Sequence, residues 1–247
     1  RFLADLTADV LATAREELAR ESLPEKAKPK KADGKKELPR RRTGATVNRY
    51  LAALSHAFTM ATREWRWMAT NPMRDVSKKK EARGRARVLA DNERERLFNA
   101  CKAGPHYLLP SVILALCTAM RQGEILALRW RHVDLDRRRL VVDDSKNGER
   151  RGVALVAAAV AVFRELNKVR VMDDDLVFVG TGSFKHAWAR AILKSKLEDF
   201  RFHDLRHTAA SYLAMNGASP SEIAVATGHK TLAMVKRYTH IADEHTV

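Results

Sequence analysis

The stretch RDVSKKKEARGRAR, residues 74–87, is the feature that most limits how this chain can fold. It contains almost no large apolar side chain, so it contributes little to a hydrophobic core. Before it, apolar residues recur only at helical spacing, whereas after it helical and strand patterns alternate. We therefore predict two domains, residues 1–80 and 88–247, joined by a linker over residues 81–87.

The net charge of the chain indicates a polyanionic partner. Lys and Arg number 46 against 30 Asp and Glu, which gives a formal net charge of +16. Nucleic acid is the first candidate partner, and an anionic membrane surface is the second. No apolar run approaches the roughly 20 residues needed to span a bilayer, and the N-terminus lacks a signal-peptide pattern. We expect a soluble intracellular protein without a membrane partner.

The first domain is predicted to be helical, with one basic interruption. Apolar residues recur at helical spacing over residues 2–20 and again in TVNRYLAALSHAFTMATREWRWM, for which Thr46 is the expected N-cap. This second helix should end before Asn71-Pro72. Between the helices, residues 22–43 are rich in Lys, Pro and Gly and predict a mobile basic loop. The loop either keeps the protein soluble or contacts DNA directly.

The second domain is predicted to combine helices with a small antiparallel sheet. RRRLVVDD and RRGVALV read as strands joined by a tight turn at Asn147-Gly148, and DLVFVG reads as a third strand. Helical patterns cover residues 89–103, 107–117, 124–128, 154–170, 184–197, 202–216, 220–227 and 231–242. The predicted fold class is therefore mainly α with a small antiparallel β-sheet. Cys101 and Cys117 lack a ligand cluster, so we expect neither a disulfide nor a structural zinc site.

The segment RFHDLRHTAASYL, residues 201–213, places three basic side chains at the start of one short helix. At helical spacing His203, Arg206 and His207 share a face, at the positive end of the helix dipole. Like charges there destabilise the helix unless an anion is present, and a phosphate would supply the missing negative charge. The alternative is an exposed basic face with a hydrogen-bonded core histidine.

An arginine also lies between two apolar helices, in CTAMRQGEILALRW. Glu124 is placed to hold Arg121 by a bidentate ion pair. An arginine between two core helices is costly without a partner. The pair is either a structural bridge or a means of directing Arg121 towards a phosphate, and we favour the second interpretation.

A further cluster occupies TGHKTLAMVKRYTHIAD, residues 227–243. His229 follows a glycine that can end a helix, and Tyr238 lies well along the next helix. A helical tyrosine is commonly a core or surface residue. It becomes a nucleophile near neutral pH only beside positive charges or a base, because its unperturbed pKa is roughly 10.

The order of these motifs resembles that of the tyrosine recombinase, or phage integrase, family. The likeness runs from about residue 46 to residue 238 and includes TVNRYLAALSHAF, NP, ALRW and HDLRHT. Its site residues are Arg121 with Glu124, Lys146 in the hairpin, His203-x-x-Arg206, Gly228-His229 and Tyr238. The basic loop has no counterpart in the family. Ala119 and Thr227 replace a Gly and a Leu that are common there, and we expect these changes to affect helix packing more than chemistry.

The resemblance implies a fold and a reaction. The fold is a helical core-binding domain, N-terminally incomplete in this chain, followed by an α+β catalytic domain. Tyr238 would attack a DNA phosphodiester, giving a 3′-phosphotyrosyl link and a free 5′-hydroxyl, with no cofactor, metal or ATP. Arg121 and Arg206 would hold the nonbridging oxygens, and His229 would add a hydrogen bond.

The resemblance also implies the proton transfers. Lys146 would protonate the departing 5′ oxygen, although a hairpin lysine is often merely solvated. His203 would assist proton transfer at Tyr238, and Glu124 would position Arg121. His207 shares the face of His203, and we expect it to support the fold rather than the reaction.

The partners follow from the same resemblance. We expect double-stranded DNA, a homo-tetramer on paired recombination sites, a monomer or dimer without DNA, and accessory DNA-bending proteins. The expected location is the bacterial or phage-infected cytoplasm, in association with the nucleoid, and a mobile-element integrase is favoured. Two alternatives remain open: a type IB topoisomerase, and a DNA-binding regulator without catalysis.

Overall fold

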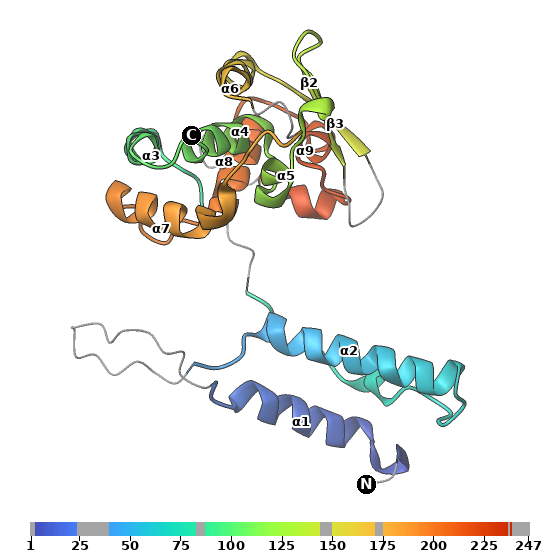
Figure 1. Cartoon of the computed structure of the whole chain (residues 1–247). Coiled ribbons are helices and arrows are strands. Elements are labelled where there is room, and N and C mark those ends of the chain that lie inside the picture. Colours follow the sequence, from blue (N-terminus) through green and yellow to red (C-terminus); the bar gives the residue numbers. More distant parts are fainter. Residues whose placement is uncertain are drawn as a thin grey trace, which may run out of the picture. The chain divides into compact units, whose positions relative to one another are not determined.

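The structure, a computed structural model, forms two compact units, Arg1–Gly84 and Arg85–Val247 (Figure 1). The boundary between them lies within residues 81–87, where the sequence predicts a linker. Each unit has a hydrophobic core of its own. The residues described are 3–23, 40–82, 87–143, 150–170, 175–236 and 238.

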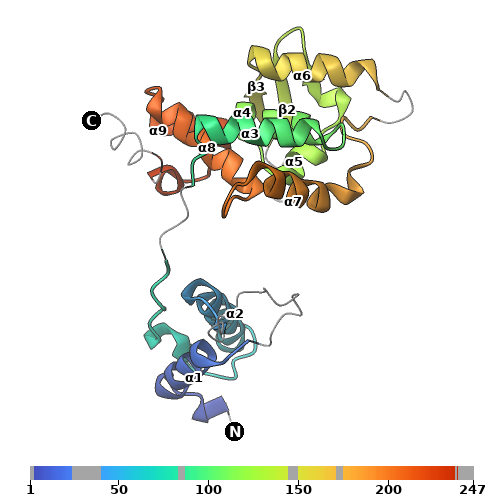
Figure 2. The ribbon, with the colours of Figure 1, turned by 90° about the vertical axis from the view of Figure 1, so that its left-hand side faces the viewer.

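The first unit is built on two helices that lie side by side, α1 (Ala8–Arg20) and α2 (Gly44–Arg63) (Figures 1 and 2). Short 3-10 turns precede and follow them, η1 (Leu3–Asp5) and η2 (Pro72–Asp75). Apolar residues three or four positions apart face the same side of each helix and meet between them. The core consists of Leu11, Val47, Leu51, Phe58, Met73 and Val76.

Helix α2 differs from the prediction at both ends. Its N-cap is Thr43, whose Oγ1 accepts a hydrogen bond from the Thr46 backbone N–H at 3.2 Å. The predicted N-cap Thr46 already lies in the first turn. The helix ends at Arg63, and the chain beyond it includes Arg66 in the left-handed region with φ of 53°. A residue in that conformation cannot continue a right-handed helix.

The two ends of the predicted basic loop are joined to each other. Ser22 and Arg41 form an antiparallel bridge, and the Leu23 N–H donates to the Arg40 carbonyl at 2.7 Å. Residues 24–39 of that loop lie outside the described residues. The bridge thus fixes where the chain leaves α1 and where it approaches α2.

Helix α4 (Leu108–Thr118) is the centre of the second unit. Its sequence LLPSVILALCT is apolar all round, as expected of a helix buried on several sides. The helices packed against it are α3 (Asp91–Lys102), α5 (Gln122–Leu126), α6 (Ala157–Lys168), α7 (Phe184–Ser195) and α8 (Phe202–Met215). Figure 1 shows α4 and α8 close together in the middle of the second unit.

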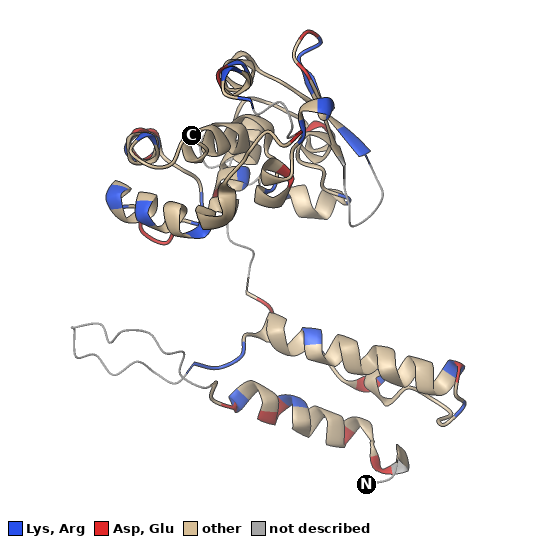
Figure 3. Ribbon diagram, in the orientation of Figure 1, with Lys and Arg blue, Asp and Glu red and all other residues tan. Residues whose placement is uncertain are grey.

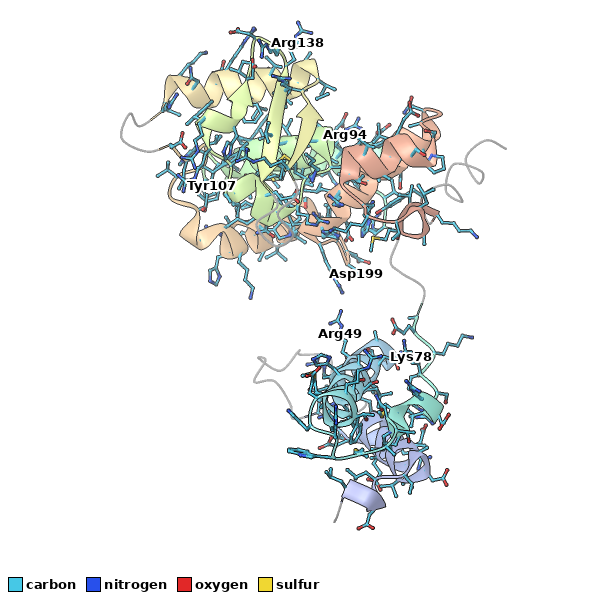
Figure 4. The ribbon with its side chains drawn as sticks, turned by 90° about the vertical axis from the view of Figure 1, so that its right-hand side faces the viewer. Arg49, Lys78, Arg94, Tyr107, Arg138 and Asp199 are labelled. Atoms are coloured by element: carbon cyan, nitrogen blue, oxygen red, sulfur yellow. The ribbon has the colours of Figure 1, made fainter. Side chains whose placement is uncertain are left out.

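A small antiparallel sheet lies at one side of the second unit. Its order is β1-β2-β3, formed by β1 (Val133–Asp134), β2 (Arg139–Asp143) and β3 (Arg150–Ala154). Leu140 pairs with Val153, and both are buried. Arg138, in the turn between β1 and β2, lies at the outer end of the unit (Figure 4). The predicted turn at Asn147-Gly148 falls outside the described residues.

The predicted third strand DLVFVG is wrong. In this segment Leu176 forms only an isolated bridge with Arg129, while β1 completes the sheet instead. Val177 and Phe178 are both buried, and the Val177 N–H donates to the Leu128 carbonyl. The segment is apolar because it fills the core beside α5, not because it joins the sheet.

Helix α9 (Pro220–Thr227) and the following helical residues, 232–236 and 238, cover one side of α8. They form a second small core composed of Ala210, Ala214, Ile223, Val235 and Tyr238. The predicted helix over residues 231–242 is described only in this part. The mainly α fold with a small antiparallel sheet is confirmed.

Three properties concern the chemistry open to the chain. Within the described ranges, no helix combines the length and apolar character needed to cross a membrane, and no three or more His, Cys, Asp or Glu side chains gather as metal ligands would. Cys101 and Cys117 form no disulfide, and burial raises the pKa of both thiols, that of Cys101 to about 12. Lys and Arg are spread over both units, including α7 and the sheet (Figure 3).

Candidate active site

The side chain of Arg206, on α8, is the buried centre of the site. The residue is 2% exposed, and its Nη1 donates to the Ala119 carbonyl at 2.7 Å. Its Nη2 is also buried and has no hydrogen-bond acceptor among the described residues. Buried N–H groups are nearly always paired, so this nitrogen is a donor whose acceptor is not among the residues that the structure describes.

Ala119 is tied to the site through its backbone. It caps the C-terminus of α4 in the left-handed conformation, with φ of 52°, which turns its carbonyl towards Arg206. Glycine adopts this left-handed conformation with less strain than alanine. This explains why a glycine is common at this position in the family that the sequence resembles. Ala119, which replaces that glycine, therefore contacts the site through its carbonyl oxygen.

Glu124 holds two arginines, one on each carboxylate oxygen. Arg121 is the N-cap of α5, and its Nη1 donates to Oε1 at 2.6 Å while its backbone N–H donates to Oε2 at 2.8 Å. Arg151 donates from Nη2 to Oε2 at 2.8 Å. The predicted pair of Arg121 and Glu124 is present, and the Arg121 side chain remains 44% exposed, so it can reach a ligand.

Arg151 also belongs to this cluster, although none of the sequence motifs points to it. On β3 it lies directly opposite the buried Val142 of β2, so both side chains lie on the inner face of the sheet. The available signal was the strand alternation in RRGVALV. It puts Arg151 in phase with Val153, which is buried.

The three arginines give the site a strong positive potential. Burial, together with the charges of Arg121 and Arg151, lowers the pKa of Arg206 to about 10, while Glu124 and Tyr238 act in the opposite direction. Arg206 therefore stays protonated at neutral pH. Three guanidinium groups face one carboxylate, Glu124, and this imbalance favours an anion in the site.

Tyr238 is buried beside two histidines. Its exposed fraction is 0%, and its Oη lies 2.7 Å from Nδ1 of His207. The ring of His229 stacks on the Tyr238 ring with 6.0 Å between centroids. The hydrogen-bonded neighbour of the tyrosine is thus His207, which was expected only to support the fold.

His203 lies beside His207. It is exposed on α8, and its ring meets the ring of His207 edge to face, with 4.9 Å between centroids. Helical spacing correctly places both histidines on one side of α8. Spacing alone does not show which of them is covered, because the segment around Tyr238 buries the second and leaves the first at the surface.

His229 is set by the end of α9. Gly228 caps this helix with φ of 67°, and a Cβ there would lie 2.8 Å from Arg151 Nη1, so only glycine fits without displacement. Thr227 Oγ1 donates to the Ile223 carbonyl at 2.6 Å and lies 2.6 Å from His229 Nδ1. Because the hydroxyl proton is already used, Nδ1 is the donor to Thr227. Thr227, which replaces a leucine that is common in the family, therefore also contacts the site.

Lys146 lies outside the described residues. The strands on either side of it, β2 and β3, are described, and β3 supplies Arg151 to the cluster. The structure thus brings together Arg121, Glu124, Arg206, His229 and Tyr238 from the predicted set, with His203 at their edge.

Comparison with known proteins gives a family match over most of the second unit. The sequence model of the phage integrase family matches residues 87–245. A shufflon-specific DNA recombinase of Escherichia coli is 40% identical over 200 residues, which cover 81% of this chain and 52% of the relative. The integrase of Salmonella phage P22 is 32% identical over 228 residues, covering 84% of this chain and 57% of the relative. The chain spans little more than half the length of these two proteins.

Solved structures share the fold. A lambda integrase dimer bound to a COC′ core site has a TM-score of 0.69 at 20% identity, covering 96% of this chain and 65% of that one. The Tn1549 transposon integrase in complex with circular intermediate DNA has a TM-score of 0.67 at 17% identity, covering 99% and 85%.

Proposed function

Because the chain belongs to the phage integrase family, we propose that it is a site-specific DNA recombinase that cleaves and rejoins duplex DNA through a covalent link to Tyr238. The observation that carries this proposal is the buried Nη2 of Arg206, which has no acceptor among the described residues. It lies in a cluster of three arginines, close to Tyr238. A DNA phosphodiester would supply the missing acceptor.

The proposed reaction exchanges one phosphate ester for another. The Tyr238 oxygen forms a bond to phosphorus, the bond to the 5′ oxygen breaks, and the strand is left with a 3′-phosphotyrosyl link. The covalent link retains the energy of the broken ester, so rejoining to a 5′-hydroxyl needs no ATP. The arginines stabilise the charge that develops in the transition state, so no metal is invoked.

Each basic residue has a proposed position around that phosphate. Arg206 Nη2 and the exposed end of Arg121 would donate to the nonbridging oxygens. Glu124, which also accepts from Arg151, would hold Arg121 in place. His229 donates from Nδ1 to Thr227. Its Nε2 therefore donates to the phosphate only when the imidazole is positively charged, a state that a nearby phosphate favours.

Two proton transfers complete the proposal. Lys146 would protonate the departing 5′ oxygen, a contribution of about 10² to 10⁴ in rate for a general acid. His203 would assist proton transfer at the tyrosine, and its ring lies against that of His207. The alternative interpretation of Lys146 as an ordinary solvated side chain predicts no loss of rate when it is removed.

The proposed partner is double-stranded DNA, bound by a homo-tetramer on paired sites with accessory DNA-bending proteins. The net charge of +16 supports strong phosphate binding, which should weaken by roughly 0.9 log units per log unit of salt for each phosphate neutralised. The bacterial and phage sources of the relatives support action on bacterial DNA in the cytoplasm.

Adduct formation on nicked DNA tests this proposal. The probe is a library of duplexes with a randomised centre, nicked in one strand and labelled at the 5′ end of that strand. Cleavage near the nick releases a short fragment, so the covalent adduct accumulates and appears as a shifted band on a denaturing gel. We expect the band with the native chain and none with Tyr238→Phe.

The same selection separates the remaining alternatives. Sequencing the trapped strands should reveal one preferred site for a recombinase, whereas a type IB topoisomerase would yield adducts without a defined site. A regulator without catalysis would bind with a similar salt dependence and form no adduct. Absence of a Tyr238-dependent band would refute the enzymatic proposal.

A further inference from the structure

We propose that His207 accepts the proton of Tyr238 as the tyrosine oxygen attacks the phosphate. The inference rests on the proposed function and deepens it, because the family resemblance implies His203 for this step. It concerns His207 Nδ1, which lies within hydrogen-bond distance of the attacking oxygen.

The contact between the two side chains is short and buried. His207 Nδ1 lies 2.7 Å from Tyr238 Oη, within the range expected of a general base and the proton it removes. His207 is 7% exposed and Tyr238 is 0% exposed. A proton leaving the phenol in this environment needs an acceptor already in place, since bulk water does not reach the oxygen.

Helix α8 holds His207 in a fixed orientation. Thr208, the next residue, is fully buried and accepts a hydrogen bond from the Leu89 N–H at 3.0 Å while donating to the Asp204 carbonyl. Asp204 in turn caps the helix by accepting from the Arg201 N–H at 2.8 Å. These bonds prevent α8 from rotating, so the imidazole stays directed at Tyr238.

His207 and Arg206 are consecutive residues of α8, so this helix carries both the proposed proton acceptor and a proposed phosphate ligand. Arg206 is directed to the end of α4, where its Nη1 meets the Ala119 carbonyl, and His207 is directed to Tyr238. The residue that would hold the phosphate and the residue that would take the proton are therefore consecutive. One rigid turn sets the distance between phosphate and nucleophile.

Every proton that moves in the proposed reaction has a donor and an acceptor. His207 is neutral, with its proton on Nε2, and Nδ1 takes the phenol proton as Tyr238 Oη bonds to phosphorus. The bond from phosphorus to the 5′ oxygen breaks, and that oxygen takes a proton from Lys146. In rejoining, the 5′-hydroxyl gives its proton back to the neutral Lys146 amine as its oxygen bonds to phosphorus. The bond from phosphorus to the Tyr238 oxygen breaks, and the His207 imidazolium returns its proton to that oxygen.

In this scheme His203 acts on the imidazole of His207 rather than on the phenol. The edge-to-face contact between their rings, at 4.9 Å, is the interaction that the structure provides for that purpose. His203 is exposed and can exchange protons with solvent. His207 regains its neutral state when it returns the proton in rejoining, so the role left to His203 is to orient and polarise the His207 imidazole.

The test measures the single-turnover rate of adduct formation on the duplex recovered by the selection above. That duplex is made with either oxygen or sulfur at the 5′ bridging position of the scissile phosphate. A thiolate departs without being protonated, so sulfur removes the need for a general acid but leaves the nucleophile's proton untouched. The two substrates therefore separate proton transfer at Tyr238 from proton transfer at the leaving group.

We expect His207→Ala to form adduct about 10² times more slowly on both substrates, the lower end of the range for a general base. Lys146→Ala should be slow on oxygen and recover most of its rate on sulfur. His207→Asn places an amide oxygen near the position of Nδ1, so it keeps the hydrogen bond but cannot take a proton. It should be as slow as His207→Ala while unfolding at the wild-type temperature.

Tyr212→Phe is the matched control on the same helix. It removes a hydroxyl of α8 that donates to the Leu89 carbonyl at 3.2 Å and leaves the cluster around Tyr238 intact. Its adduct should form at the wild-type rate. If His207→Ala unfolds at a lower temperature, the comparison of His207→Asn with this control carries the test.

Three results would overturn the inference. A wild-type rate for His207→Asn would mean that His207 only orients the tyrosine, and a wild-type rate for His207→Ala would mean that it does neither. Recovery of His207→Ala on the sulfur substrate would place its action at the leaving group. Failure of the native chain itself to form an adduct would count against the proposed function instead.

Discussion

Helices α2 and α8 both bury polar side chains, but they satisfy them in different ways. On α2, the Asn48 side chain donates to the Lys79 carbonyl and to Glu81 Oε1 and accepts from the Lys79 N–H, all within 2.9 Å. On α8, Arg206 has one partner, the Ala119 carbonyl, and a second buried nitrogen with none among the described residues. The difference separates a buried side chain whose partners all belong to the fold from one that keeps a donor without a described partner, which the proposed function assigns to a phosphate.

The largest expected effect is on Arg206→Met, which should separate activity from stability. Loss of one donor to the transition-state charge should slow adduct formation by about 10² to 10³. The unfolding temperature should change little, because removing a buried charge that faces Arg121 and Arg151 offsets the loss of the hydrogen bond to the Ala119 carbonyl. Gel assays and thermal melts measure the two quantities. A marked loss of stability would show that Arg206 is mainly a structural residue.

Asn48→Leu should show the opposite pattern. It leaves the Lys79 N–H and carbonyl without their partner, which should lower the stability of the first unit by about 2 kcal/mol. Hydrogen exchange of α2 amides measures this loss. On DNA at saturating protein, the rate of adduct formation should stay within a factor of about two. Unchanged exchange would mean that the Asn48 bonds do not hold α2 to the Lys79 segment.

Gly228→Ala tests the contact between α9 and Arg151, and Gly217→Ala is its control. Both glycines have positive φ, so alanine strains either backbone by about 1 kcal/mol. At Gly228 the new Cβ also meets Arg151, whereas at Gly217 it meets open space. We expect adduct formation to fall about tenfold, or roughly 1.4 kcal/mol, for Gly228→Ala only. Equal losses in the two variants would assign the effect to backbone strain.

The smallest expected effect concerns the start of α2. Thr43→Ala should weaken the helix by about 1 kcal/mol, because it removes the N-cap acceptor for the Thr46 N–H. Thr46→Ala should have less than half that effect, measured by exchange of the first-turn amides. A larger loss of stability for Thr46→Ala than for Thr43→Ala would mean that Thr46 is the N-cap.

Much of the fold follows from local signals in the sequence. The predicted helix over residues 220–227 coincides with α9 because Ser219, Pro220 and Gly228 supply its cap, its first position and its left-handed end. The prediction was wrong where the conformation of a segment depends on packing against residues that are distant in the sequence. DLVFVG has the composition of a strand, yet its buried residues pack beside α5 and leave the sheet to β1.

In the candidate site too, contacts between residues close in sequence could be predicted and contacts between distant residues could not. Arg121 and Glu124 lie three residues apart at a helix start, so their pairing could be predicted from spacing. The nearness of Arg151 could not, because β3 brings it to Glu124 from 27 residues away. Nor could spacing distinguish His207 from His203, since the difference between them is made by the segment that carries Tyr238. The catalytic role of each site residue stays a prediction.

The bridge between Ser22 and Arg41 has a consequence for how this chain can change in evolution and in the laboratory. Because the two flanks of the basic segment are joined to each other, the distance between α1 and α2 does not depend on how many residues lie between them. Doubling the length of a closed loop costs only about 0.6 kcal/mol. The segment is therefore a natural position at which sequence can be gained, lost or replaced by a reporter, without altering the core that the two helices share.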